Sequence, residues 1–298
     1  MSDQPVKKPP LILPERLQPR MRGAQAANDL LARSLSGDEP FLAARFGGSE
    51  SKVLNEIVFQ KKANASEAFA QELQMKSGVS PRNPLTIRKF VYETMTAGLN
   101  TDLLAIWSYQ NQVKLAGFCN PPHICGLDHL NPIVALRKHG LVPWTRALSG
   151  KKILVVHPFE NDIRAQIQRL QDIHVVRDLW PEDVSFDTLR APITFAGEAD
   201  GRKWVEELSK TRAEIARRDF DIVFVGAGAY GMPLGSFVKT MGKRAVHFGG
   251  ALQLLFGIIG ARWEKNPLYD DVFGEGWIRP DQSELPRLHH RIDQSSYW

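Results

Sequence analysis

The 298-residue sequence predicts an α/β fold in which a mostly parallel sheet is covered by helices on both faces. The expected strands 151–157 and 221–226 contain continuous apolar runs, residues 153–156 and 222–225, as expected of strands buried on both faces. Helical patterns alternate with these strands, which is the order of a parallel sheet with crossover helices. Hydrophobic residues make up 43% of the chain and charged residues 24%, so the sequence can build a sizeable core.

The first half of the chain opens with a proline-rich segment, residues 1–22, which is expected to form an extended arm. A domain over residues 23–265 follows. Its first expected elements are a helix over 26–37, a strand over 42–46, a helix after the Gly47–Gly48 turn capped by Ser49, and helices around one buried strand (102–107) within 65–115.

The second half alternates more regularly. The expected strands are 151–157, 173–179, 221–226 and 243–248, and the expected helices are 160–171, 202–218 and 231–241. Residues 266–298 are polar and broken by prolines. We expect them to form a tail packed on the domain, without a domain of their own.

Lys and Arg number 38 against 33 Asp and Glu, a formal charge of +5 that is spread along the chain. A nucleic-acid-binding protein would show a clustered basic face, so this class is not expected. The mild excess suits phosphorylated ligands, and peripheral association with an anionic membrane stays open. Cys119 and Cys125 do not have a zinc or redox spacing and are expected to be reduced and packed. Since no targeting segment is visible, we expect a cytoplasmic protein.

The stretch 221–235, DIVFVGAGAYGMPLG, follows a predicted strand with the glycines Gly226, Gly228 and Gly231. Their spacing is that of a dinucleotide-binding turn, which also needs a carboxylate about 20 residues later, at the end of the next strand. That strand carries no carboxylate at its end, where it reads His247, Phe248, Gly249 and Gly250. An NAD(P)-dependent oxidoreductase is therefore the weaker interpretation. Another phosphorylated ligand, or plain packing of strand against helix, stays open.

Two other turns have the same character. In "RFGGSE" a glycine turn between strand and helix is flanked by Arg45, whose planar fork can bind phosphate, and by Glu50. Glu50 could contact a metal or a sugar hydroxyl, act as a general base, or simply stabilise the first turn of the helix. His157 ends the strand 151–157 and could bind phosphate, move a proton, or have only a structural role.

Four segments together resemble the bacterial GT-D glycosyltransferase family, which is found in polysaccharide and glycan assembly. They are "RFGGSE", "GKKILVVHPFENDI", "FDIVFVGAGAYGMPLGSFVKTMGK" and "AVHFGGALQLLFGIIGARW". The resemblance implies a Rossmann-like domain, a nucleotide-sugar donor and a glycan acceptor. Family members carry an Asp-x-Glu motif associated with the diphosphate and a divalent metal. Here Gly48 stands in place of that Asp, while Glu50 matches the Glu, so dependence on Mn²⁺ or Mg²⁺ stays open.

The resemblance and the turns together assign roles. Glu50 is the first candidate for the catalytic base or metal contact, and His157 is the second catalytic candidate. The residues expected to bind the nucleotide sugar are Arg45, Gly47, Gly48, Gly226, Gly228, Tyr230, Gly231, His247, Gly249 and Gly250. A catalytically lapsed partner protein of glycan assembly, which keeps the fold and the ligand, is the alternative. The donor sugar, the acceptor and the oligomeric state do not follow from the sequence.

Overall fold

The computed structural model describes residues 13–107, 110–292 and 297–298. Within these ranges the strands form one parallel sheet in the order β1-β4-β3-β2-β8-β7-β5-β6. They are β1 (Met21–Arg22), β2 (Phe41–Arg45), β3 (Leu103–Ile106), β4 (His123–Gly126), β5 (Lys152–His157), β6 (Ser185–Arg190), β7 (Ile222–Val225) and β8 (Arg244–His247). The predicted fold class, a parallel sheet covered by helices on both faces, is confirmed.

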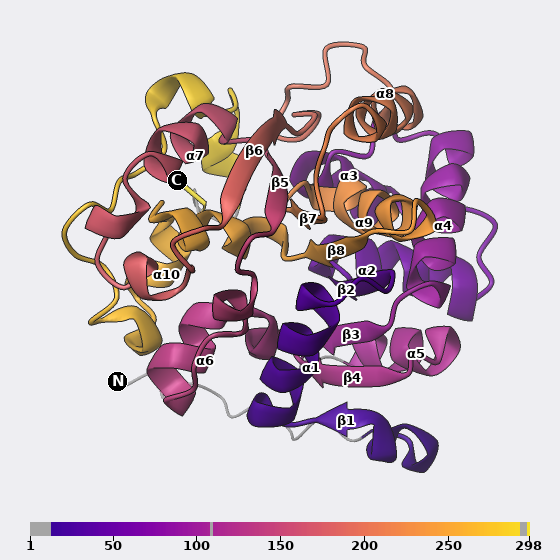
Figure 1. Cartoon of the computed structure of the whole chain (residues 1–298). Helices are drawn as coiled ribbons and strands as arrows, with labels where there is room; N and C mark the ends of the chain where they lie inside the picture. Colours follow the sequence, from indigo (N-terminus) through magenta and orange to yellow (C-terminus); the bar gives the residue numbers. More distant parts are fainter. Residues whose placement is uncertain (1–12, 108–109, 293–296) are drawn as a thin grey trace, which may run out of the picture.

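The helices cover both faces of this sheet, and Figure 1 shows the two layers. One layer contains α2 (Gly48–Leu54), α3 (Glu67–Ser77), α4 (Pro84–Leu99), α5 (Gln110–Cys119), α8 (Trp204–Ala216) and α9 (Gly231–Thr240). The other contains α1 (Ala24–Ser36), α6 (Pro132–His139), α7 (Glu160–Ile167), α10 (Ala261–Glu264) and the 3₁₀ helix η8 (Gly249–Phe256). Each layer has its own hydrophobic core.

The central strands are mostly apolar because successive side chains enter opposite cores. In β7, Ile222 and Phe224 belong to the core with α1, α7 and η8, whereas Val223 and Val225 belong to the core with α4, α8 and α9. All four are fully buried. This is the two-residue period of a strand with both faces covered, and it explains why the sequence pattern shows no polar alternation.

The connections create a crevice at the carboxyl edge of the sheet. β5 pairs with β7, yet the helix after β5 (α7) lies on one face and the helix after β7 (α9) lies on the other. Likewise β2 pairs with β8, while α2 and η8 leave toward opposite faces. Where the connections after neighbouring strands diverge in this way, the sheet edge stays open, and ligands of α/β proteins bind there.

Some of the predicted elements are wrong. Residues 173–179 do not form a strand: they contain the short 3₁₀ helix Val176–Asp178, with Val175 at a φ of 65°, and follow another at Leu170–Asp172. The edge strand is instead β6, whose alternate residues Ser185 and Asp187 are exposed and gave no apolar run. β4 was also missed, because "HICG" is too short to stand out.

The two ends of the chain are attached to the domain. Residues 1–12 of the expected extended arm lie outside the described residues; the remainder forms a 3₁₀ helix (Glu15–Arg20) and β1, which pairs with β4. In the expected tail, the described residues form only short 3₁₀ helices, turns and an isolated bridge to Ile258. Residues from this tail enter the core beside α7 and η8, among them Tyr269, Val272, Ile292 and Trp298.

Cys119 and Cys125 are free and buried, as predicted. Among the described helices, none is both long enough and apolar enough to cross a bilayer.

The double burial of the central strands makes a testable prediction. Replacing the fully buried Leu154 of β5 by Ala removes side-chain volume from a packed core, so we expect the free energy of unfolding to fall by about 2–5 kcal/mol. Lys152, two residues earlier in the same strand, forms an exposed ion pair with Asp219. Lys152→Ala should therefore cost less than about 1 kcal/mol in the same urea titration. Equal losses for the two variants would contradict this packing.

Candidate functional site

A cavity of about 570 Å³ opens at the carboxyl edge of the sheet. Its lining comes from the turns after five strands, β2, β3, β5, β7 and β8, and from α3, α10 and the C-terminal tail. The predicted site residues that it brings together are Arg45, Gly47, Gly48, Glu50, His157, Gly226, Gly228, Gly249 and Gly250. Segments that lie 200 residues apart in the chain therefore meet at one place, as the parallel-sheet prediction requires.

Arg45, the last residue of β2, places a cation at the floor of the cavity. Its side chain is 9% exposed, and its guanidinium lies over the Trp107 ring, 5.5 Å from the ring centroid. Nη1 donates a hydrogen bond to the carbonyl oxygen of Phe46 at 3.3 Å, while Nε has no hydrogen-bond partner among the described residues. Within the same part of the chain no carboxylate lies within 4.0 Å of the guanidinium, so its charge is not neutralised by an ion pair.

Glu50, in the first turn of α2, folds back onto the start of its own helix. The backbone N–H of Gly47 donates to Glu50 Oε2 at 2.5 Å, so Glu50 caps this helix, and the prediction that Ser49 does so is wrong. The Ser49 hydroxyl instead pairs with the Ser77 hydroxyl at 2.6 Å. Burial raises the pKa of Glu50 above its ordinary value, although the charge of Arg45 and the Gly47 N–H act against this rise. A carboxylate with a raised pKa is a stronger base than an ordinary glutamate.

His157, the last residue of β5, is buried and neutral. The backbone N–H of Phe159 donates to its Nδ1 at 3.0 Å, which places the ring proton on Nε2. Burial lowers the pKa of His157 to about 3, so the ring stays uncharged at physiological pH. This histidine is a hydrogen-bond donor and a weak base, which argues against the proton-transfer role considered from the sequence.

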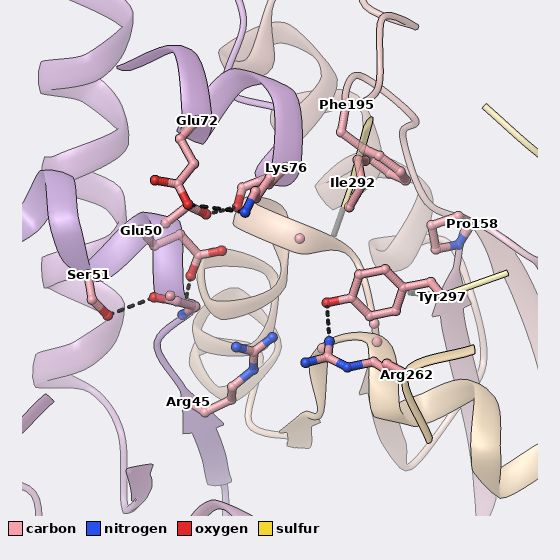
Figure 2. A pocket seen from close by; sticks show the side chains of 18 of the residues that line it. Arg45, Glu50, Ser51, Glu72, Lys76, Pro158, Phe195, Arg262, Ile292 and Tyr297 are labelled. Carbon is pink, nitrogen blue, oxygen red and sulfur yellow. Dashed lines mark hydrogen bonds and ion pairs between the residues drawn. The ribbon is translucent and has the colours of Figure 1, made fainter. Parts of the chain in front are cut away.

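Arg262 and Tyr297 complete the cavity wall, and sequence reasoning missed both. Arg262 lies in α10, and its Nη1 donates to the Tyr297 hydroxyl at 2.7 Å. Figure 2 shows that the guanidinium groups of Arg262 and Arg45 point into the same space from two sides. Arg262 is exposed and has no ion-pair partner in the described part of the chain. The only signal in the sequence was that Arg262 belongs to the segment "AVHFGGALQLLFGIIGARW", which also contains the Gly249–Gly250 turn.

The glycines of the turns make room for side chains of the protein itself. A Cβ on Gly47 would overlap the Glu50 carboxyl group, and one on Gly249 would overlap the Arg45 guanidinium. The same holds for Gly226 against the His157 ring and for Gly250 against the Tyr297 ring. These glycines therefore let charged and aromatic side chains reach the cavity.

Three of the predicted site residues do not line the cavity. Tyr230 is buried, stacks on Trp204, and shares a hydrogen bond with the Thr194 hydroxyl at 2.7 Å. His247 is buried beneath Gly231, and its Nδ1 lies 3.3 Å from the Val225 carbonyl oxygen. Burial lowers the pKa of His247 to about 3. Tyr230, Gly231 and His247 therefore pack the strand–helix junction behind the cavity, although the sequence placed them at the ligand.

The donor set does not fit a divalent metal ion. Gly48 has no side chain to offer, and Glu50 is engaged by the Gly47 N–H with a cation beside it. The other carboxylate of the cavity, Glu72, forms ion pairs with Lys52 at 2.6 Å and Lys76 at 3.3 Å. No group of three or more His, Cys, Asp or Glu is placed to hold a metal in the residues described. Because Mg²⁺ and Mn²⁺ take several oxygen ligands, Glu50 alone makes a poor site.

No protein-family model and no curated protein sequence matches this chain. Solved structures with a related arrangement include a protein described as the highly conserved domain of unknown function 1792 with a distinct glycosyltransferase fold. It is 13% identical, has a TM-score of 0.42, and the match covers 89% of this chain and 94% of that chain. Another is described as a new glycosyltransferase from Streptococcus sanguinis, with 11% identity, a TM-score of 0.43, and coverage of 88% and 95%. Likeness at this level carries no weight for function, which has to follow from the residues of the cavity.

The close approach of Gly249 to Arg45 can be tested by adding a single methyl group. Gly249 has a φ of +66°, and a Cβ there would overlap the guanidinium, so Gly249→Ala should lower the free energy of unfolding by about 1–3 kcal/mol. Gly48 is the matched control, because it starts α2 at an ordinary φ and nothing lies within 4 Å of an added Cβ. Gly48→Ala should be neutral or stabilise by up to about 1 kcal/mol. A harmless Gly249→Ala in urea unfolding would contradict the contact.

The raised pKa of Glu50 predicts a dependence of stability on pH. Between its ordinary value of 4.5 and its higher value in the folded protein, the folded state binds the proton more tightly than the unfolded state. Stability contributed by this group therefore falls as pH rises through that window. Gln keeps an acceptor for the Gly47 N–H without a charge, so the stability of Glu50→Gln relative to the natural protein should increase with pH, by about 1.4 kcal/mol per pKa unit of elevation.

Urea titrations of both proteins from roughly pH 4.5 to pH 8 measure this difference directly, because the other titrating groups are common to both. A difference that stays constant over the range would show that the pKa of Glu50 is not raised. A difference that shrinks with rising pH would show that it is lowered.

Proposed function

We propose that the protein is a glycosyltransferase that transfers a sugar from a nucleotide-sugar donor to a glycan or polysaccharide acceptor. The observation that carries this proposal is the cavity itself, in which the turns after β2, β7 and β8 meet around two arginines that form no ion pair with any described residue. Its volume of about 570 Å³ lies within the range of small-molecule sites. The resemblance of four sequence segments to GT-D glycosyltransferases supports the same ligand.

The polar groups of the lining suit the parts of such a donor. Arginine forks match phosphate oxygens, so Arg45 is assigned to the diphosphate. Gln112 and Gln253 line the same cavity, both are fully buried, and each has an amide oxygen without a hydrogen-bond partner in the described part of the chain. Buried acceptors of this kind suit hydroxyl donors, which a sugar supplies in number.

Transfer also needs a base for the acceptor hydroxyl, and Glu50 is assigned to this role. Its carboxyl lines the cavity, and burial raises its pKa, which makes the carboxylate a stronger base than an ordinary glutamate. His157 is assigned to donating a hydrogen bond from Nε2, since its Nδ1 already accepts one. Phe195, Ile292 and Trp298 supply an apolar part of the lining, which helps to exclude water from the reacting groups.

A ligand panel tests the proposal. Nucleoside diphosphates and nucleotide sugars should raise the melting temperature of the purified protein; at a hundred times its Kd a ligand adds about 2.7 kcal/mol of stability. NADH and NADPH serve as controls in the same melting-temperature measurement, and we expect them not to change the melting temperature. Release of nucleoside diphosphate from the stabilising nucleotide sugar, in the presence of a glycan acceptor, measures transfer.

The outcomes separate the alternatives. If a nucleotide sugar stabilises the protein but no acceptor is glycosylated, the result favours the alternative of a catalytically lapsed partner protein. That alternative is motivated by Gly48, which stands in place of the family's Asp. Stabilisation by nicotinamide cofactors alone would mean that the glycine loop binds a dinucleotide and that the proposal is wrong.

A further inference from the structure

We propose that Arg45 and Arg262 together hold the diphosphate of the donor and take the place of a divalent metal ion. This inference rests on the proposed function for the identity of the ligand. The chemical claim can be tested separately from that function, because it concerns which groups neutralise the charge of the diphosphate: two arginine side chains of this chain.

The first step is the charge of the cavity. Four cationic side chains line it (Arg45, Lys52, Lys76 and Arg262), against two carboxylates, Glu50 and Glu72. Lys52 and Lys76 both form ion pairs with Glu72. The two arginines have no ion pair within the described residues, so their positive charges are the ones left for an anionic ligand.

The second step is the way in which each arginine is held. Arg45 is nine-tenths buried, and its Nε lacks a hydrogen-bond partner in the described part of the chain, although a buried donor is costly when unsatisfied. A ligand oxygen would satisfy it. Arg262 is supported by two rings, with the Trp263 centroid at 5.4 Å and the Tyr297 centroid at 5.0 Å. A guanidinium fixed in this way loses little further freedom on binding.

The third step is that two backbone amides of the glycine turns already donate hydrogen bonds within the protein. The N–H of Gly47 donates to Glu50, and the N–H of Gly226 donates to the Val156 carbonyl oxygen in the sheet. Two of the glycine turns that the sequence assigned to the phosphates therefore have amides committed to the protein. Charge on a bound diphosphate would be met mainly by guanidinium groups, which form charge-assisted, bidentate hydrogen bonds with phosphate.

In the reaction, the bond between the anomeric carbon and the diphosphate oxygen breaks, and its electron pair stays on the diphosphate. A bond forms between the anomeric carbon and the acceptor hydroxyl oxygen, whose proton passes to Glu50. The diphosphate thus gains one negative charge as it leaves. Two fixed cations beside it stabilise that charge in the transition state, a contribution that a metal ion makes in other enzymes.

Calorimetric titration with inorganic pyrophosphate, and with nucleoside diphosphates, tests the inference in EDTA and in Mn²⁺. We expect the natural protein to bind in EDTA with an affinity within about twofold of that in Mn²⁺. Arg262→Gln, a change at an exposed residue that should leave the fold intact, should weaken binding in EDTA by about tenfold or more. Arg262→Lys keeps the positive charge but lacks the planar guanidinium fork, so its affinity in EDTA should lie between those of the natural protein and Arg262→Gln.

Arg279→Gln is the matched control, because Arg279 is an exposed arginine that pairs with Glu264 of α10 and does not line the cavity. The affinity of Arg279→Gln for pyrophosphate should stay within about twofold of the affinity of the natural protein. Binding that requires Mn²⁺, binding that Arg262→Gln leaves unchanged, or no binding in EDTA would each overturn the inference.

These results are distinct from a failure of the proposed function. If pyrophosphate binds without metal, Arg262→Gln abolishes this binding and no nucleotide sugar binds, the two-arginine site is supported and the glycosyltransferase proposal is wrong. If sugar transfer occurs only with Mn²⁺, the glycosyltransferase proposal is supported and the two-arginine inference is wrong.

Discussion

A buried cation without an ion-pair partner in the described residues is the constraint around which the cavity is built. Arg45 ends β2 at the centre of the sheet, where a charge removed from water is costly unless something compensates it. The Trp107 ring and the Phe46 carbonyl oxygen supply part of that compensation. Glu50 supplies some at longer range, and its own pKa reflects the balance between burial and this cation. The remaining cost favours a cavity that receives an anion.

The glycines around Arg45 follow from the same constraint. A side chain on Gly249 would occupy the place of the guanidinium, and one on Gly47 would occupy the place of the Glu50 carboxyl. The same glycine-rich sequence pattern at a strand end can therefore serve two different purposes. It can admit a phosphate to the backbone, or it can admit the protein's own charged side chains to the edge of the sheet. Here the second purpose is the one that geometry supports at Gly47 and Gly249.

Much of the fold follows from the sequence because the central strands are short, have apolar centres and are separated by segments with helical periodicity. The strand ends at Arg45, His157 and Gly226 were predicted to meet, and parallel pairing brings them to one cavity. Side-chain direction is less accessible, because each step of one residue along a strand turns the side chain to the other face. His247 ends β8 as predicted, yet its ring packs behind the cavity. Arg262 and Tyr297 were missed because no local pattern says where a tail returns to the domain.

Gly48 is the position at which the resemblance and the structure are most informative together. The GT-D motif has an acidic residue there, and nothing within 4 Å of a Cβ on Gly48 would obstruct one. Packing therefore does not explain the glycine, and a chemical reason has to be sought. Arg45 and Arg262 form no ion pair among the described residues, and a carboxylate at this position would compete with the diphosphate for both of them. With the acid absent, the two guanidinium groups stay available to the ligand.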